Sequence, residues 1–198
     1  MIPRPEGCAI FTRRSILLPL LFPLILAACG GAGPDRLPPV QPSDIASLEA
    51  RILALGPGVD PAEAARAASI AYTYPRQLAV EYGITDPPLI HNTKVNAGRR
   101  PRGLCWHWAE DMENRLAAEH FQTLDLHRAI ANSDVAFRID HSTVLIGPKG
   151  GTMEDAIILD PWRFGGELYW GTVAGDKKYK WLPQEDVLER RALERANG

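Results

Sequence analysis

The chain has 198 residues, of which 23% are charged and 45% hydrophobic, with a formal net charge of −2 at pH 7. This length and composition are typical of one folded domain with a proper core rather than of a disordered segment. There is no basic excess to attract nucleic acid or anionic surfaces in general, so no nucleic-acid partner is expected.

The first 28 residues are predicted to be a signal peptide. Arg13 and Arg14 form a positive segment, residues 15–26 are apolar, and small residues around Ala28 are typical of a cleavage site. A membrane-spanning helix needs about 20 apolar residues, and this apolar run is shorter and interrupted by prolines. We therefore expect the segment to be removed.

The end of this segment, Leu26-Ala27-Ala28-Cys29, resembles the bacterial lipobox. The resemblance implies that Cys29 is lipidated and becomes the mature N-terminus, so that the lipid bilayer is a partner. Gly30, in place of an aspartate, implies the periplasmic face of the outer membrane in the bacterial cell envelope. The alternative is an ordinary secretory peptide cleaved at the same place.

Residues 29–43 are rich in glycine and proline and have almost nothing to bury. This composition predicts an extended tether that reaches at most about 40 Å. Residues 44–198 are then predicted to form a single domain. No pattern in the sequence indicates the oligomeric state.

Helices are predicted at the beginning of this domain. Apolar spacing indicates a helix over residues 45–55, and a capping sequence starts a second helix over residues 60–73. Pro75 is expected to break or kink that helix before a shorter helical piece over residues 76–82. Residues 89–103 are expected to be extended and rich in loops.

A central helix is predicted from residue 104 or 105 to about residue 120, because Cys105, Trp108, Met112 and Leu116 share one face. The later pattern is strand-like and predicts an antiparallel sheet packed on this helix, an α+β fold with N-terminal helices. The expected elements are strands at residues 124–131, 136–147 and 155–160, short strands near 169–170 and 179–182, and a last helix over 184–195.

Three residues are in the order that nucleophilic catalysis by cysteine requires. Cys105 opens the central helix, His141 begins a strand and Asp160 ends the next one, which suits a nucleophile, a base and a group that orients the base. If Cys29 is lipidated, Cys105 has no partner for an internal disulfide. An unpaired thiol in an oxidising compartment suggests reactivity, and a buried, inert cysteine is the alternative.

The helix start favours the thiolate form of a cysteine, because its free N–H groups carry partial positive charge. His107 is about 200° around the helix from Cys105, so His141 is the expected base. Three nearby arginines either add positive potential at the sulfur or form an exposed basic loop: Arg99, Arg100 and Arg102.

The sequences around these residues, Gly-Leu-Cys-Trp, Asp-His-Ser-Thr-Val and Ile-Leu-Asp-Pro-Trp, resemble the transglutaminase-like branch of the papain-like cysteine enzymes. The resemblance implies a papain/transglutaminase-like core with Cys105 as nucleophile, His141 as base and Asp160 as orienter. The separations of 36 and 19 residues suit the compact core of that branch. The separation in papain, about 130 residues or more between cysteine and histidine, does not fit. In the compact cell-wall branch the third residue is usually a histidine, so Asp160 argues against it.

No glutamine lies just upstream of Cys105 to complete a papain-type oxyanion hole. The Cys105 backbone N–H would supply one donor, and Asn92, Asn96 or a tryptophan N–H would be needed for a second. Trp106 and Trp162 adjoin proposed catalytic residues and either form walls of a substrate cleft or simply pack in the core.

No metal or cofactor is expected. The soft ligands available are Cys105, His91, His107, His120 and His127, and no metal-binding spacing organises them. The sequence also contains no phosphate-binding glycine loop and no dinucleotide fingerprint.

These patterns predict a membrane-tethered cysteine hydrolase or acyltransferase that acts on amide bonds of peptides, including cell-wall peptides, through a thioester. The alternative is a non-catalytic lipoprotein scaffold that keeps the fold and works by binding. A Cys105 sulfur close to His141 and open to a cleft would favour the enzyme. Because Asp160 ends a strand before a turn, Asp160→Asn is expected to change the free energy of unfolding by no more than about 1 kcal/mol.

Overall fold

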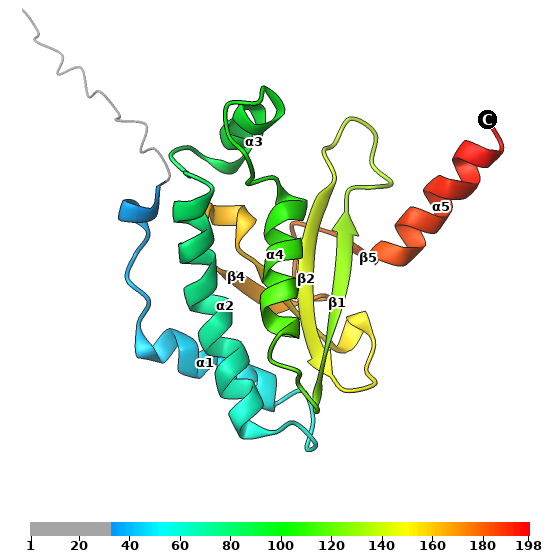
Figure 1. Ribbon diagram of the computed structural model, residues 1–198. Coiled ribbons are helices and arrows are strands. Elements are labelled where there is room, and N and C mark those ends of the chain that lie inside the picture. Colours follow the sequence, from blue (N-terminus) through cyan, green and yellow to red (C-terminus); the bar gives the residue numbers. More distant parts are fainter. Residues whose placement is uncertain (1–32) are drawn as a thin grey trace, which may run out of the picture. The chain divides into compact units, whose positions relative to one another are not determined.

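An antiparallel sheet of five strands lies at the centre of the computed structural model (Figure 1), which describes residues 33–198. The predicted signal peptide and Cys29 lie outside the described residues. The strand order is β4-β3-β2-β1-β5, and every neighbouring pair is antiparallel. The strands are β1 (Leu124–Ala131), β2 (His141–Pro148), β3 (Ile157–Asp160), β4 (Tyr169–Thr172) and β5 (Trp181–Pro183).

Helices cover one face of this sheet, which confirms the predicted α+β class. The helices are α1 (Pro42–Leu53), α2 (Pro61–Glu81), α3 (Pro88–Asn96), α4 (Cys105–Ala117) and α5 (Gln184–Ala196), with short 3-10 turns η1 (Pro34–Arg36), η2 (Met153–Asp155) and η3 (Trp162–Phe164). The central helix α4 packs on β2 and β1, and α2 packs between α4 and α1. No helix within residues 33–198 is both long and apolar enough to span a membrane.

Each face of the sheet has its own group of buried side chains. Trp108 and Met112 from α4 pack with Val144 and Leu159 between the helices and the sheet. On the opposite face a smaller cluster includes Leu145, Ile158 and Trp181. In contrast, α5 (red in Figure 1) extends away from the sheet and buries only Val187. The predicted packing of the Cys-bearing helix on the sheet is confirmed.

Helix α2 continues through Pro75, where a break or kink was expected, as one helix over Pro61–Glu81. It begins as predicted, because the Asp60 side chain accepts a hydrogen bond from the Glu63 N–H at 3.0 Å. A proline in a helix interior costs about 3 kcal/mol. Pro75 and Ala79 are both buried in the core, and this packing favours the continuous helix.

The expectation of an extended segment over residues 89–103 was wrong for its first half, which is helix α3. Pro88 occupies the first helical position, where its fixed φ suits a helix and its missing N–H costs nothing. The two prolines that exclude a helix interior therefore start a helix here. Of its buried residues, His91 bonds the loop in front of α4 and Asn92 bonds Trp162.

The strand expected from residue 136 begins only at His141, and residues 132–140 form a loop. Phe137 has a φ of +62° and is fully exposed, which no strand position would allow. Ile139 is also exposed, and its carbonyl accepts a hydrogen bond from the Asn132 amide at 3.0 Å. The loop therefore presents apolar side chains to solvent.

Part of the segment expected to be a tether, residues 29–43, belongs to the folded unit. Leu37 packs against the core, and the Arg76 guanidinium donates a hydrogen bond to the Pro38 carbonyl. Gly33 lies against the backbone of Ile84. The composition of the segment predicted little burial, but Leu37 and the bond from Arg76 connect it to the folded unit.

Candidate active site

The backbone in front of α4 makes a turn that only glycine fits. Gly103 has a φ of +120°, and a Cβ there would lie 2.4 Å from Nε2 of the buried His91. Leu104 is the N-cap, so Cys105 is the first helical residue, as predicted. The Trp108 indole donates to the Gly103 carbonyl at 3.1 Å and fastens the turn to the helix.

His107 holds the same turn from within the helix. Its Nδ1 accepts hydrogen bonds from the backbone N–H groups of Gly103 and Leu104, both at 3.1 Å. Burial and the charge of Arg102 hold the pKa of His107 below its usual range, which favours this neutral, accepting form. His107 therefore positions the segment that carries Cys105, a role that the sequence pattern did not indicate.

Arg102 does not belong to a free basic loop, because carboxylates on α4 pair with its charge. Its guanidinium pairs with Asp111 at 2.7 Å and with Glu110 at 2.9 Å. These bonds connect the residue before Gly103 to the second turn of α4. The arginine thus contributes to the placement of the helix start.

His141 and Asp160 meet across two neighbouring strands. His141 begins β2 and Asp160 ends β3, and the His141 Nε2 is 2.7 Å from the Asp160 Oδ2. Their exposed fractions are 2% and 0%. Since a carboxylate accepts, Nε2 carries the proton, and Nδ1 has no hydrogen-bond partner among the described residues. The imidazole is oriented as a triad requires.

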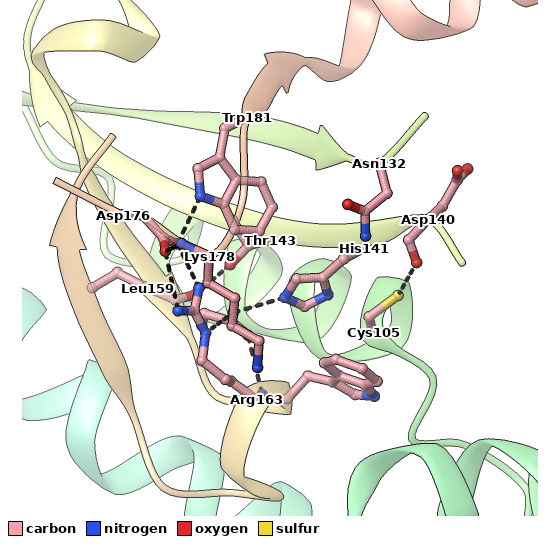
Figure 2. A network of polar contacts seen from close by, with 12 residues as sticks. Cys105, Asn132, Asp140, His141, Thr143, Leu159, Arg163, Asp176, Lys178 and Trp181 are labelled. Atoms are coloured by element: carbon pink, nitrogen blue, oxygen red, sulfur yellow. Dashed lines mark hydrogen bonds and ion pairs between the residues drawn. The ribbon is translucent and has the colours of Figure 1, made fainter. Parts of the chain in front are cut away.

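The His141 ring lies between the Cys105 sulfur and the Arg163–Asp176 pair, as Figure 2 shows. The Cys105 thiol itself donates a weak hydrogen bond of 3.5 Å to the carbonyl of Asp140. Burial lowers the pKa of His141, but the Asp160 charge, its hydrogen bond and the nearby Cys105 side chain together raise this pKa to about 9. His141 is therefore an imidazolium at neutral pH.

Sequence reasoning missed the ion-pair network behind Asp160. The Arg163 Nε donates to Asp160 at 2.9 Å, and the same guanidinium binds Asp176 at 2.6 Å. The Trp181 indole donates to Asp176 at 3.0 Å. Asp160 is thus a fully buried charge with several partners, so Asp160→Asn is expected to cost more than the change of about 1 kcal/mol that its strand-end position alone predicted. The available signal was Arg163, a lone charged residue in a short apolar stretch.

Aromatic rings surround the remaining faces of His141. The ring centroids of Trp162, Tyr179 and Trp181 lie 4.6, 4.7 and 5.2 Å from the imidazole centroid. The electron-rich faces of such rings attract a cation. These contacts favour the imidazolium form, and they make Trp162 both a packing residue and a neighbour of the site.

Two cavities meet above the cysteine and the histidine. The cysteine chamber, about 710 Å³, is lined by Cys105, Trp106, Asn92 and Asn96, and the histidine chamber, about 670 Å³, by His141, Trp162, Tyr179 and Phe137. Leu89, Ile139 and Asp140 line both. Although Cys105 is only 7% exposed, its side chain opens to a space that can hold a ligand.

Asn92 is the best placed of the predicted oxyanion donors. It is 7% exposed, and its Oδ1 accepts a hydrogen bond from the Trp162 indole at 3.2 Å. That bond fixes the amide so that its NH2 group is left to donate, and this group has no partner within residues 33–198. The Trp162 N–H is consumed by the bond, while Asn96 is exposed at the end of α3.

Among residues 33–198, no three or more His, Cys, Asp or Glu side chains come together in a way that could hold a metal ion. The buried His91 instead donates from Nε2 to the Arg102 carbonyl at 2.9 Å. No protein-family model, curated protein or solved structure matches the chain. The assignment of the site therefore depends on its geometry.

Proposed function

We propose that this protein is a cysteine-dependent enzyme with a papain/transglutaminase-like core that cleaves or exchanges amide bonds of peptides. One observation carries the proposal: Asp160 holds the His141 imidazole through Nε2 and leaves Nδ1 unbonded on the side of Cys105. Cys105 is the nucleophile, His141 the proton carrier and Asp160 the orienting residue. No cofactor takes part in this scheme.

The reaction begins with attack of the Cys105 thiolate on the substrate carbonyl carbon. The resulting oxyanion accepts hydrogen bonds from the Cys105 backbone N–H and from the Asn92 amide. The C–N bond then breaks as His141 gives its proton to the leaving nitrogen, and a thioester remains on the sulfur. Water or an amine attacks this thioester, His141 takes the proton of the nucleophile, and the sulfur leaves as thiolate.

The alternative of a non-catalytic scaffold has less support. A scaffold has no need of an aspartate-bound histidine beside a cysteine, nor of a cysteine side chain that lines a cavity. It also has no need of the buried amide of Asn92, held with its NH2 group free in the wall of the cavity that Cys105 also lines. Together these groups make up a nucleophile, a proton carrier and an oxyanion donor.

The proposal includes a location. Cys29, outside the described residues, is proposed to carry lipid and to hold the enzyme at the periplasmic face of the bacterial outer membrane, next to cell-wall peptides. Membrane partitioning and a diacylglycerol mass on the N-terminal peptide would support this, and Cys29→Ser should abolish both. Soluble wild-type protein with an unmodified N-terminus would instead indicate simple secretion.

The rate of Cys105 alkylation by iodoacetamide tests the catalytic part without knowledge of the substrate. At pH 6, where an ordinary thiol is almost wholly protonated, we expect the wild type to react about 100-fold faster than His141→Ala. His120→Asn is the matched control, because His120 is exposed and its positive φ suits asparagine. Equal rates for the wild type and His141→Ala would refute the proposal.

A further inference from the structure

The histidine chamber contains two cations without a carboxylate partner within residues 33–198. Arg138, in the loop over residues 132–140, makes no ion pair there. The backbone N–H of Lys178 donates to Asp176 at 3.0 Å, but its ammonium contacts only the Tyr179 ring, at 5.3 Å. Arg163 and the His141 imidazolium also line the chamber, and their two charges are balanced by Asp160 and Asp176. The chamber therefore has an unbalanced positive charge at its exposed rim.

The cysteine chamber differs, because each charged group that lines it has a partner. Glu110 pairs with Arg102 at 2.9 Å, Arg128 with Glu113 at 2.9 Å, and Arg191 with Asp140 at 2.7 Å. Most of the remaining wall is apolar, with Leu89, Leu104, Trp106, Ile130, Ile139 and Leu188. Asp140 lines both chambers, and its bond to Arg191 leaves the cations of the histidine chamber unmatched.

The proposed chemistry assigns one chamber to each side of the scissile bond. The carbonyl carbon must lie at the Cys105 sulfur, and its oxygen must reach Asn92, so the acyl part extends into the cysteine chamber. The leaving nitrogen must receive its proton from His141, which lines the other chamber. The leaving-group part of the substrate therefore extends past His141 toward Arg138 and Lys178.

We infer that the enzyme selects peptides with an apolar residue on the acyl side of the scissile bond and a carboxylate on the leaving-group side. The assignment of one chamber to each side of the scissile bond rests on the proposed function. The carboxylate is either the C-terminus of the residue that leaves or an acidic side chain. Phe137 and Trp162 add apolar walls beside the cations, so an aromatic residue with a free C-terminus fits the histidine chamber.

Binding to a Cys105→Ala variant, measured by calorimetry, tests the inference without turnover. The probes are acetyl-Leu-Phe with a free carboxylate, its C-terminal amide, acetyl-Leu-Glu-amide and acetyl-Leu-Lys-amide. We expect the free acid to bind about three- to tenfold more tightly than its amide, and the lysine peptide to bind most weakly. If the glutamate peptide equals the free acid, an acidic side chain is an equivalent source of the carboxylate.

Charge variants then locate the effect. Arg138→Gln and Lys178→Gln should each reduce the preference for acid over amide, and the double variant should remove it. Lys177→Gln is the matched control, since Lys177 is an exposed neighbour whose ammonium binds the Ala174 carbonyl instead. Equal affinity for acid and amide, tightest binding of the lysine peptide, or no binding by any probe would overturn the inference. Alkylation of Cys105 that does not depend on His141 would overturn the proposed function while leaving a measured charge preference intact.

Discussion

The two sides of His141 are built differently. Behind it, Asp160, Arg163 and Asp176 form a chain of buried ion pairs with bonds of 2.6–2.9 Å. In front of it, α3 and the loop over residues 132–140 present exposed apolar side chains around two cavities. The contrast teaches that the orientation of the imidazole is fixed by the sheet, whereas the surface for a ligand is supplied by loops and helix ends that carry little of the fold's stability.

Replacement of Asp160 should have the largest effect, because it acts on both stability and chemistry. Asp160→Asn removes the charge that pairs with Arg163 and orients His141, so we expect a loss of about 2–4 kcal/mol in the free energy of unfolding. Cys105 labelling or turnover should fall by orders of magnitude. Denaturant unfolding and labelling measure the two effects. Asp155→Asn, in the exposed turn before β3, is the control, and an equally small effect of both variants would contradict the buried network.

Substitution of Gly103 tests whether the side in front of His141 also contains a rigid segment. Gly103→Ala places a methyl group against His91 at a φ of +120° and should cost about 3 kcal/mol. Gly98→Ala is the control, because Gly98 also has a positive φ but has open space around it, and should cost about 1 kcal/mol. Urea unfolding compares them. Similar losses in the free energy of unfolding for the two variants would mean that the turn at Gly103 adapts to a side chain. The side in front of His141 would then differ even more from the buried ion pairs behind it.

The pH dependence of stability reports on the side behind His141. The folded-state pKa of about 9 exceeds the usual 6.5, so the stabilisation from this residue is complete below pH 6.5 and is lost as the pH rises through 9. A shift of this size corresponds to about 3 kcal/mol. Unfolding free energies at pH 6.5 and pH 9.5 should therefore differ by about this amount in the wild type and by much less in His141→Gln. A flat profile in both proteins would show that His141 stays neutral.

The smallest effect on stability is expected in front of His141. Phe137 is fully exposed, so Phe137→Ser should change the free energy of unfolding by less than about 0.5 kcal/mol. If the loop contacts ligands, the same change should weaken binding of acetyl-Leu-Phe. Thermal unfolding and calorimetry separate the two effects. A large loss of stability would mean that the loop belongs to the structural half of the molecule.

The α+β fold, the central helix and the meeting of His141 with Asp160 were predictable from the sequence because each depends on local signals. Apolar spacing marked α4, and strand ends marked the two residues. Helix α3 was missed because Pro87 and Pro88 exclude a helix interior but not a helix start. The strand before His141 was overextended because apolar residues such as Phe137 do not reveal whether they are buried.

The residues that hold the site in place were less predictable from the sequence than Cys105, His141 and Asp160. Asp176 bonds Arg163, and Trp181 bonds Asp176, only after the chain has passed through β4 and a turn. No periodic pattern in the sequence indicates these contacts. The same limit applies to His107, because no local pattern in the sequence indicates that its Nδ1 accepts hydrogen bonds from Gly103 and Leu104. The residues proposed as nucleophile, base and orienter lie at helix and strand ends that the sequence marks, whereas the residues that hold them depend on tertiary contacts.

The docking of residues 33–41 against α2 changes how a lipid anchor would restrain the molecule. If Cys29 carries lipid, only residues 29–32 precede Gly33, and they span at most about 14 Å. Gly33 lies against Ile84, between the end of α2 and the start of α3. Such a short connection would attach the membrane anchor close to α3, the helix that lines both chambers. It would therefore limit the angles at which the two chambers can face the membrane as well as their height above it.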